Sequence, residues 1–501
     1  MNRRTAATII LLTWAGALGW LVQRNYLSAP RASDVPRWPV PPGSAFQAIR
    51  IGGRQYGLAS FTVDTLPDGL RVVDLVTLDL PPIGNQSPRR TSTRTEARYT
   101  RALQLRSWTS SVLTEHGRSA STGSVSGDTL LTVIGGGRGE APETLTVALR
   151  RPVVLPSAIP LVAASRGLPR SGTKLNVEIY DPLDHELRSE HLSVAAESLF
   201  TIPDSATYLE SIRRWTVAHA DTIRGWRLER IEHGLPLLQW IDAAGMTLRV
   251  QHPMGAVLDR SAFELVNSNF RALPVPPWDT SAAAPSYLPS DGSPEPARRF
   301  RVLGRLTPAA VLPKVLPALE GGWQSRRGDT LEVSAISGTD SAPERPVIAD
   351  PLLNAGDPGL ARAAALAAGR ESQPGRVAQA LNDWVRRTIR VREGAGTWSA
   401  GRAFRNRSGT PIERVRVLVA LARSAGLEAR PVSGLVRVDG RWQLREWAEI
   451  WTGTWTPADP SMTSASPLAA RIRLTTGGDA RQLDLALRAG RLCLDVLEET
   501  Q

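Results

Sequence analysis

The sequence is poor in the side chains that most enzymes use for covalent or metal chemistry. Its 501 residues contain one cysteine, Cys493, so no internal disulfide and no cysteine-based metal site can form. The last of its six histidines is His252, which leaves residues 253–501 without an imidazole. Lysine occurs only as Lys174 and Lys314 among 60 basic residues. Stability must therefore come from packing, and arginine carries almost all of the positive charge.

Length and composition indicate a folded chain of several domains. An apolar content of 42% over 501 residues is enough for two or three hydrophobic cores. The formal charge of +12 is spread along the chain, without a basic cluster or an aromatic RNA-binding motif. We therefore expect no nucleic-acid partner. The same charge would favour anionic lipid headgroups or acidic partners.

The amino-terminal segment is typical of a membrane anchor. Residues 5–22 read T-A-A-T-I-I-L-L-T-W-A-G-A-L-G-W-L-V, which is uncharged and about long enough to cross a bilayer as a helix. Arg3 and Arg4 precede it and favour a cytoplasmic amino terminus. A cleaved signal peptide would need a small-x-small cleavage site, and none is convincing. We expect a single-pass protein of the bacterial inner membrane, with residues 1–4 cytoplasmic, 5–23 spanning and the bulk periplasmic.

Composition divides the rest of the chain into further segments. The proline-rich residues 24–44 predict a stiff spacer. Alternating apolar residues predict an antiparallel β-rich domain at 45–272, with hairpin turns at P-D-G (residues 67–69) and D-A-A-G (residues 242–245); we expect the second hairpin to start from Trp226. Residues 273–298, rich in proline, serine and alanine, predict a linker.

The carboxyl-terminal part changes to mixed helix and strand patterns. Apolar residues recur at three- and four-residue spacing over 376–391, which predicts an amphipathic helix. Thr410, Pro411 and Glu413 form the sequence signature of a helix start with a capping box. Strands are expected at 427–438, 441–451 and 454–458. The fold class is therefore α+β and multidomain, with a second domain at 299–480 that includes a preceding β segment, and a tail at 481–501.

Four segments of this domain are similar, in order and spacing, to the transglutaminase-like superfamily. The family core reads approximately G-D-C-x-E-H, then G-I-P-A-R-x-V-x-G-L, H-A-W-A-E-V and W-x-x-x-D-P. This chain reads G-T-P-I-E-R at 409–414, G-L-E-A-R-P-V-S-G-L at 426–435, R-E-W-A-E-I at 445–450 and W-T-P-A-D-P at 455–460. The resemblance covers about a fifth of the chain and implies a transglutaminase-like fold, the fold of cysteine proteases, for this part.

The resemblance also implies a degenerate catalytic triad. Pro411 stands where the family has its cysteine, Arg445 stands where it has its histidine, and only Asp459 is retained. Proline offers no nucleophile, and arginine stays protonated and cannot act as a general base. An ion pair between Arg445 and Asp459 could replace the lost contact, unless Arg445 points to solvent. We therefore expect a pseudoenzyme without a cofactor.

Two further segments can be interpreted as either structural or functional. Residues 181–191 gather two histidines and four carboxylates, but their spacing matches no standard metal site and predicts an exposed turn, so we expect no metal. Exposed side chains near Arg445 could line a binding groove, which makes Arg445, Trp447, Glu449 and Trp451 candidate binding residues. Their alternative role is in the core and at strand ends.

Three functions remain open. The first is a degenerate module that binds a peptide, a glycan or neighbouring membrane or periplasmic proteins. The second is an accessory structural subunit of a larger membrane complex. The third is a hydrolase with an unexpected nucleophile such as Ser408 or Thr410, which would lack a recognisable base nearby.

Overall fold

The computed structural model describes most of the chain from residue 40 onward. The described ranges are 40–51, 53–80, 89–114, 117–135, 141–165, 170–232, 235–252, 256–272, 299–306, 324–327, 330–333, 352–353, 357–392, 398–438, 441–462, 471–476 and 492–500. The predicted anchor at 5–23 and the predicted linker at 273–298 lie outside them. Within these ranges no helix is long and apolar enough to span a membrane.

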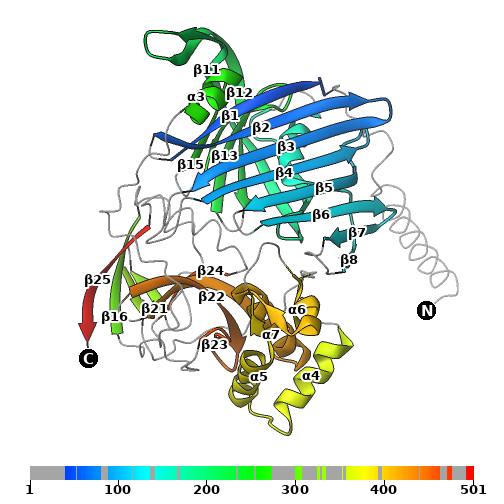
Figure 1. Ribbon diagram of the computed structural model, residues 1–501, viewed down its shortest axis with the longest axis vertical. Coiled ribbons are helices and arrows are strands. Elements are labelled where there is room, and N and C mark those ends of the chain that lie inside the picture. The colour runs from blue at the N-terminus through cyan, green and yellow to red at the C-terminus, as the bar shows by residue number, and fades with distance from the viewer. Residues whose placement is uncertain are drawn as a thin grey trace, which may run out of the picture.

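A 15-stranded sheet forms the larger of the two parts in Figure 1. Its strands are β1 (Gly43–Ile51), β2 (Arg54–Leu66), β3 (Gly69–Leu80), β4 (Arg89–Tyr99), β5 (Leu105–Thr114), β6 (Gly117–Ser126), β7 (Thr129–Ile134), β8 (Glu143–Ala148), β9 (Val153–Val154), β10 (Lys174–Asp181), β11 (Glu186–Leu209), β12 (Arg214–Glu232), β13 (Leu235–Ile241), β14 (Thr247–Gln251) and β15 (Ala256–Ser261). The first and last strands, β1 and β15, are neighbours in the middle of the sheet. Neighbours are antiparallel except β9 and β10, so the predicted antiparallel β-rich domain is confirmed.

The two predicted hairpins have different outcomes. The turn at residues 67–69 joins β2 to β3, as expected. The turn at 242–245 joins β13 to β14, whereas Trp226 lies on β12, the preceding strand, so the hairpin that we expected to start at Trp226 was wrong. The error arose because alternating apolar residues continue from β12 into β13 across a connection of only two residues. The pattern therefore predicts one strand where the structure has two.

The large sheet curls until its two halves share one core. Val63 and Trp108 from one half pack in the same cluster as Ile179 and Leu228 from the other. A hydrogen bond of 2.9 Å between the Thr132 hydroxyl of β7 and the Tyr180 hydroxyl of β10 crosses this core. Curling buries one face of an antiparallel sheet without a second sheet, which agrees with the alternating polar and apolar residues of its strands. The helical segments of this part are η2 (Pro156–Ala158), α2 (Ile159–Ser165), η3 (Glu264–Ser268) and α3 (Asn269–Ala272).

The second part is an α+β domain. Its helices are α4 (Pro358–Ala368), α5 (Pro374–Thr388), α6 (Ala400–Asn406) and α7 (Pro411–Ser424), and its main sheet has the order β23 (Trp455–Ala458), β22 (Arg441–Trp451), β21 (Ala429–Val438) and β24 (Arg471–Thr476). The short strands β19 (Arg390–Val391) and β20 (Ser408–Gly409) pair in parallel. Helix α7 packs on β21 and β22 through Val417 and Leu421, which share a buried core with Ala448 and Ile450. The helices predicted around 376–391 and from Pro411 are confirmed.

A third, four-stranded sheet is completed by the end of the chain. Its order is β17 (Gln324–Arg327), β18 (Thr330–Val333), β16 (Arg299–Leu306) and β25 (Leu492–Thr500). Strand β25 lies within 481–501, the range that we expected to form a tail, and pairs antiparallel with β16. The pairing joins residues almost 200 positions apart, so no local signal could reveal it. Gln324 links this sheet to β24 by exchanging hydrogen bonds with the Arg473 backbone at 2.8 and 3.0 Å.

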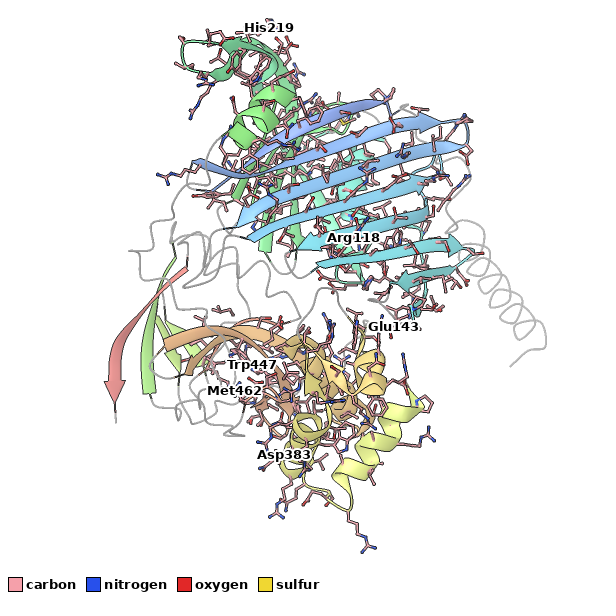
Figure 2. All side chains as sticks on the ribbon, viewed as in Figure 1. Arg118, Glu143, His219, Asp383, Trp447 and Met462 are labelled. Atoms are coloured by element: carbon pink, nitrogen blue, oxygen red, sulfur yellow. The ribbon has the colours of Figure 1, made fainter. Side chains whose placement is uncertain are left out.

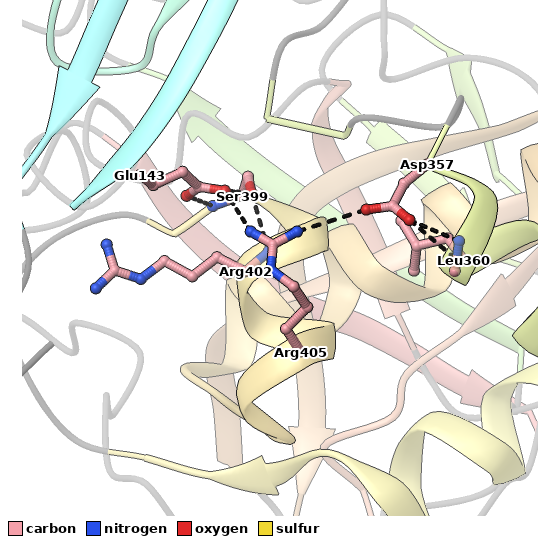
Figure 3. A network of polar contacts seen from close by, with 7 residues as sticks. Glu143, Asp357, Leu360, Ser399, Arg402 and Arg405 are labelled. Carbon is pink, nitrogen blue, oxygen red and sulfur yellow. Dashed lines mark hydrogen bonds and ion pairs between the residues drawn. The ribbon is translucent and has the colours of Figure 1, made fainter. Parts of the chain in front are cut away.

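Glu143 of β8 connects the large sheet to the α+β domain (Figure 3). Its carboxylate accepts hydrogen bonds from the backbone N–H and the hydroxyl of Ser399, the residue that caps α6. Arg405 of α6 lies 3.5 Å from both Glu143 and Asp357, the N-cap of α4. One carboxylate from the β-rich part therefore completes the polar cap of a helix in the other part.

Candidate functional site

Helix α7 begins at Pro411 because the residues around it satisfy the first backbone N–H groups. Thr410 is the N-cap, and the Glu413 carboxylate accepts the Thr410 backbone N–H at 2.8 Å in a capping box. Glu413 is fully buried and also accepts two hydrogen bonds from Arg392, at 2.6 and 3.1 Å. The start of the helix is thus firmly fixed, while Pro411 itself is exposed.

The other two positions of the predicted triad lie at neighbouring strands. Arg445 is on β22, and Asp459 directly follows β23, which pairs with β22. Asp459 is buried, and its Oδ1 accepts the backbone N–H of Ser461 at 2.8 Å. Its Oδ2 lies 3.7 Å from Nη1 of Arg471 on β24. Asp459 therefore forms an ion pair with Arg471, an arginine other than Arg445, which the sequence suggested as one of two possibilities.

Two buried arginines share the charge of Asp459. Burial lowers the pKa of Arg414, one turn into α7, and also the pKa of Arg471, and in both cases Asp459 partly offsets the shift. The charge of Arg445 lowers the pKa of Arg471 further. Asp459, which would orient a histidine in the family, is here surrounded by arginines.

Sequence reasoning missed both of these arginines. Arg414 could have been found, because the i, i+3 spacing from Pro411 places it on the same side of the helix start. Arg471 gave no signal, since it reaches Asp459 only through the pairing of β24 with β21. Its side chain is almost fully buried, and its guanidinium also lies 5.6 Å from the Trp447 ring.

The four predicted binding residues separate into buried and half-buried pairs. Trp447 and Glu449 are 0% exposed. Trp447 packs in a small apolar cluster, and Glu449 accepts hydrogen bonds from Arg430 and Arg473 at 2.6 to 2.9 Å, so both hold the sheet together. Arg445 and Trp451 are half-buried, and they are the members of this set that can reach a ligand.

An open cleft of about 470 Å³ adjoins this cluster. It is lined by Arg386 and Arg387 at the end of α5, by Arg414 of α7 and by residues 460–462 after β23. Figure 2 labels Met462 of this cleft beside Trp447, with Asp383 of α5 below them. The cleft is cationic on its helical side and apolar toward the sheet.

Residues with metal-binding side chains occur elsewhere. His185 and Glu190, in the segment 181–191 that we expected to be an exposed turn, are both 3% exposed, because this segment turns inward between β10 and β11. Glu190 instead pairs with Arg188 and Arg230 at 2.9 and 2.8 Å. Within the described ranges, the group with ligand-like spacing is Asp204, His219 and Asp221, three exposed residues on the β11–β12 hairpin.

The fold and the site together define a class of domain. A buried helix begins beside the edge of an antiparallel sheet, and the motif positions for a nucleophile, a histidine and an aspartate lie at that junction. Residues 361–460 match the transglutaminase-like superfamily, as the sequence motifs predicted. The carboxyl-terminal part of this chain is therefore a transglutaminase-like domain.

Comparison of whole chains adds little to this assignment. No curated protein matches the chain. Three solved structures overlap with it: a β-barrel-like protein of unknown function from Brucella abortus (10% identity, 44% of this chain and 94% of that chain, TM-score 0.31), a candidate cysteine protease from Cytophaga hutchinsonii (13%, 66% and 84%, 0.23) and a candidate protease from Parabacteroides distasonis (10%, 61% and 70%, 0.19). Scores this low do not establish a shared overall fold.

Proposed function

We propose that this protein is a non-catalytic binding module built on a transglutaminase-like domain. The observation that carries the proposal is the chemistry at the junction of α7 and the sheet, where Pro411 and Arg445 occupy the positions of the family's thiol and imidazole. Arginines Arg414 and Arg471 hold the retained Asp459. A site of this composition has charge for recognition and lacks a nucleophile paired with a base.

We further propose that residues 5–23 anchor the protein in the bacterial inner membrane and that the described domains lie in the periplasm. The supporting observations are the uncharged segment and the preceding Arg3 and Arg4. Amino-terminal sequencing of the purified native protein tests the anchor. A mature chain that begins near residues 29–32 and is released by salt would contradict it.

An activity assay of the wild-type protein tests the absence of catalysis. Amide hydrolysis and acyl transfer should stay at background, with or without a thiol-blocking reagent. Ser408→Ala, Thr410→Val and Asp459→Asn should leave that background unchanged. Activity that any one of these substitutions abolishes in folded protein would establish a hydrolase with an unexpected nucleophile. The variant Pro411→Cys with Arg445→His serves as a comparison, because it restores the two missing groups.

The surface of the β11–β12 hairpin favours a second candidate function, an accessory subunit of a membrane complex. The hairpin projects from the large sheet (Figure 1) and exposes several large apolar side chains. Near its tip they are Tyr208, Leu209, Ile212 and Val217, with exposures of 41 to 55%. Exposed apolar side chains in one region are typical of protein contacts. Copurification of a partner from mild detergent that depends on this hairpin, and not on the transglutaminase-like domain, would favour the second function.

A further inference from the structure

The cleft beside the degenerate triad contains a buried cation whose bonding is incomplete. Arg414 is 4% exposed and lines the cleft. Its Nη2 donates to the backbone carbonyl of Arg386 at 3.2 Å, which satisfies one carbonyl at the end of α5. Its Nε has no hydrogen-bond partner. A buried donor on a charged group is costly to leave unsatisfied, so this atom is a position where a ligand gains binding energy.

A second buried polar atom belongs to another residue that lines the cleft. The Ser461 hydroxyl is shielded and has no hydrogen-bond partner, although the Ser461 backbone N–H is bound by Asp459. Ser461 and Arg414 both line the cleft. Two unpartnered donors lining one cleft suit a group that accepts several hydrogen bonds.

The charge of the cleft is not balanced by nearby acids. Arg386 pairs with Asp383 at 3.0 Å, but Arg387 is exposed and makes no ion pair with any described residue. Asp459, the carboxylate whose charge acts on Arg414, also pairs with Arg471. Basic residues at the end of a helix commonly serve only to stabilise the helix dipole, and this role accounts for Arg386 and Arg387. It does not account for Arg414, whose buried guanidinium comes from a different helix, α7.

We propose that this cleft binds an oxyanion, a carboxylate or a phosphate, carried on a ligand with a short apolar stem. Arg387 and Arg414 hold the anion through charge-assisted hydrogen bonds, the Ser461 hydroxyl donates a further bond, and Pro460 and Met462 contact the stem. The inference rests on the proposed function, because it assigns the ligand class of the same degenerate site.

Calorimetric titration of the full-length protein with three probes tests the proposal. The probes are inorganic phosphate, N-acetyl-alanyl-alanine with a free carboxylate, and the same dipeptide as its neutral amide. We expect binding of at least one anion, weakened by added salt, and none of the amide. Phosphate binding alone would indicate a phosphorylated ligand, and preference for the dipeptide acid would indicate a peptide carboxylate.

Variants assign the binding to the cleft. Arg387→Ala should weaken anion binding about tenfold, as expected for the loss of one charge-assisted contact. Arg376→Ala is the matched control, since Arg376 lies on the same helix with a side chain that is 71% exposed, outside the cleft, and it should change nothing. Arg414→Lys keeps the charge but removes Nε as a donor, and should weaken binding while the protein stays folded.

Three outcomes would overturn the proposal: no binding of either anion, equal binding of the acid and the amide, or equal losses in Arg387→Ala and Arg376→Ala. The activity assay described above is independent of these titrations. Catalysis without anion binding would refute both proposals, whereas anion binding by a protein with hydrolytic activity would refute only the non-catalytic function.

Discussion

Asp74 places a carboxyl group on the inward face of the large sheet. It lies on β3 opposite Phe61 and Thr95, which are both buried. Burial raises its pKa to about 6 from 3.8. Because the folded-state pKa is raised, the folded protein prefers the neutral acid. Ionisation then destabilises the fold progressively from about pH 4 to pH 6, and the penalty is complete above pH 6.

The variant Asp74→Asn should remove this penalty. We expect it to raise the free energy of unfolding at pH 7.5 by up to about 3 kcal/mol, the equivalent of the pKa shift, and to have little effect at pH 3.5. Urea unfolding at the two pH values measures the difference. Asp128→Asn, at an exposed turn, should have no comparable effect at either pH. A gain that is equal at both pH values would show that the charge of Asp74 is not its cause.

Glu449 forms the centre of a buried ion triad with Arg430 and Arg473. Glu449→Gln keeps the shape but removes the buried negative charge that both guanidinium groups bind, so we expect a loss of about 3 to 5 kcal/mol in the free energy of unfolding. Glu197→Gln breaks an exposed pair with Arg224 at 3.8 Å and should cost less than about 0.5 kcal/mol. Denaturant unfolding compares the two variants, and similar small losses would contradict a structural role for Glu449.

At the scale of elements, helix α7 shows how much local chemistry determines. Thr410, Pro411 and Glu413 fix its start, and the strand β22 spans the predicted residues 441–451. These elements were predictable because caps, alternation and turn residues act within a few positions. Strands β24 and β25 were not predicted, since their pairing depends on distant partners.

The cap of α7 should contribute measurably to stability. Thr410→Ala should lower the free energy of unfolding by about 1 kcal/mol. Glu413→Gln should cost more, about 3 kcal/mol, because the fully buried carboxylate also binds Arg392 and the Trp398 backbone N–H. Pro411→Ala should change stability by less than about 1 kcal/mol, since Pro411 is exposed and makes no cap bond. Thermal or urea unfolding of the three variants measures these losses of stability. A larger loss in Pro411→Ala than in the other two variants would contradict the prediction.

At the scale of the whole molecule, Glu143 joins the two parts. The contact is buried, and a small apolar cluster of Ile134, Leu145 and Leu352 lies in the same region. This junction couples the two parts because Glu143 of the large sheet accepts a hydrogen bond from Ser399, the N-cap residue of α6 in the α+β domain (Figure 3).

Glu143→Gln should loosen α6 without unfolding the large sheet. We expect hydrogen exchange at the first turn of α6 to accelerate about tenfold, as for the loss of roughly 1.5 kcal/mol of hydrogen bonding, with unchanged exchange in β2 and β3. Mass spectrometry of exchanged peptides measures both regions. Glu178→Gln, at a half-buried position of β10, is the control. Equal acceleration in the sheet would indicate global destabilisation instead of a local junction.

The sequence by itself predicted the transglutaminase-like domain, the helix over 376–391 and the start of α7 at Pro411. All of these depend on residue type and short spacing. Only the tertiary structure decided that Arg471 forms the ion pair with Asp459. The pairing of β24 with β21 brings Arg471 to this position, and no local sequence pattern encodes that pairing. It also decided that Trp447 and Glu449 are buried while Arg387 and Arg414 line a cleft, since exposure depends on how distant segments pack together.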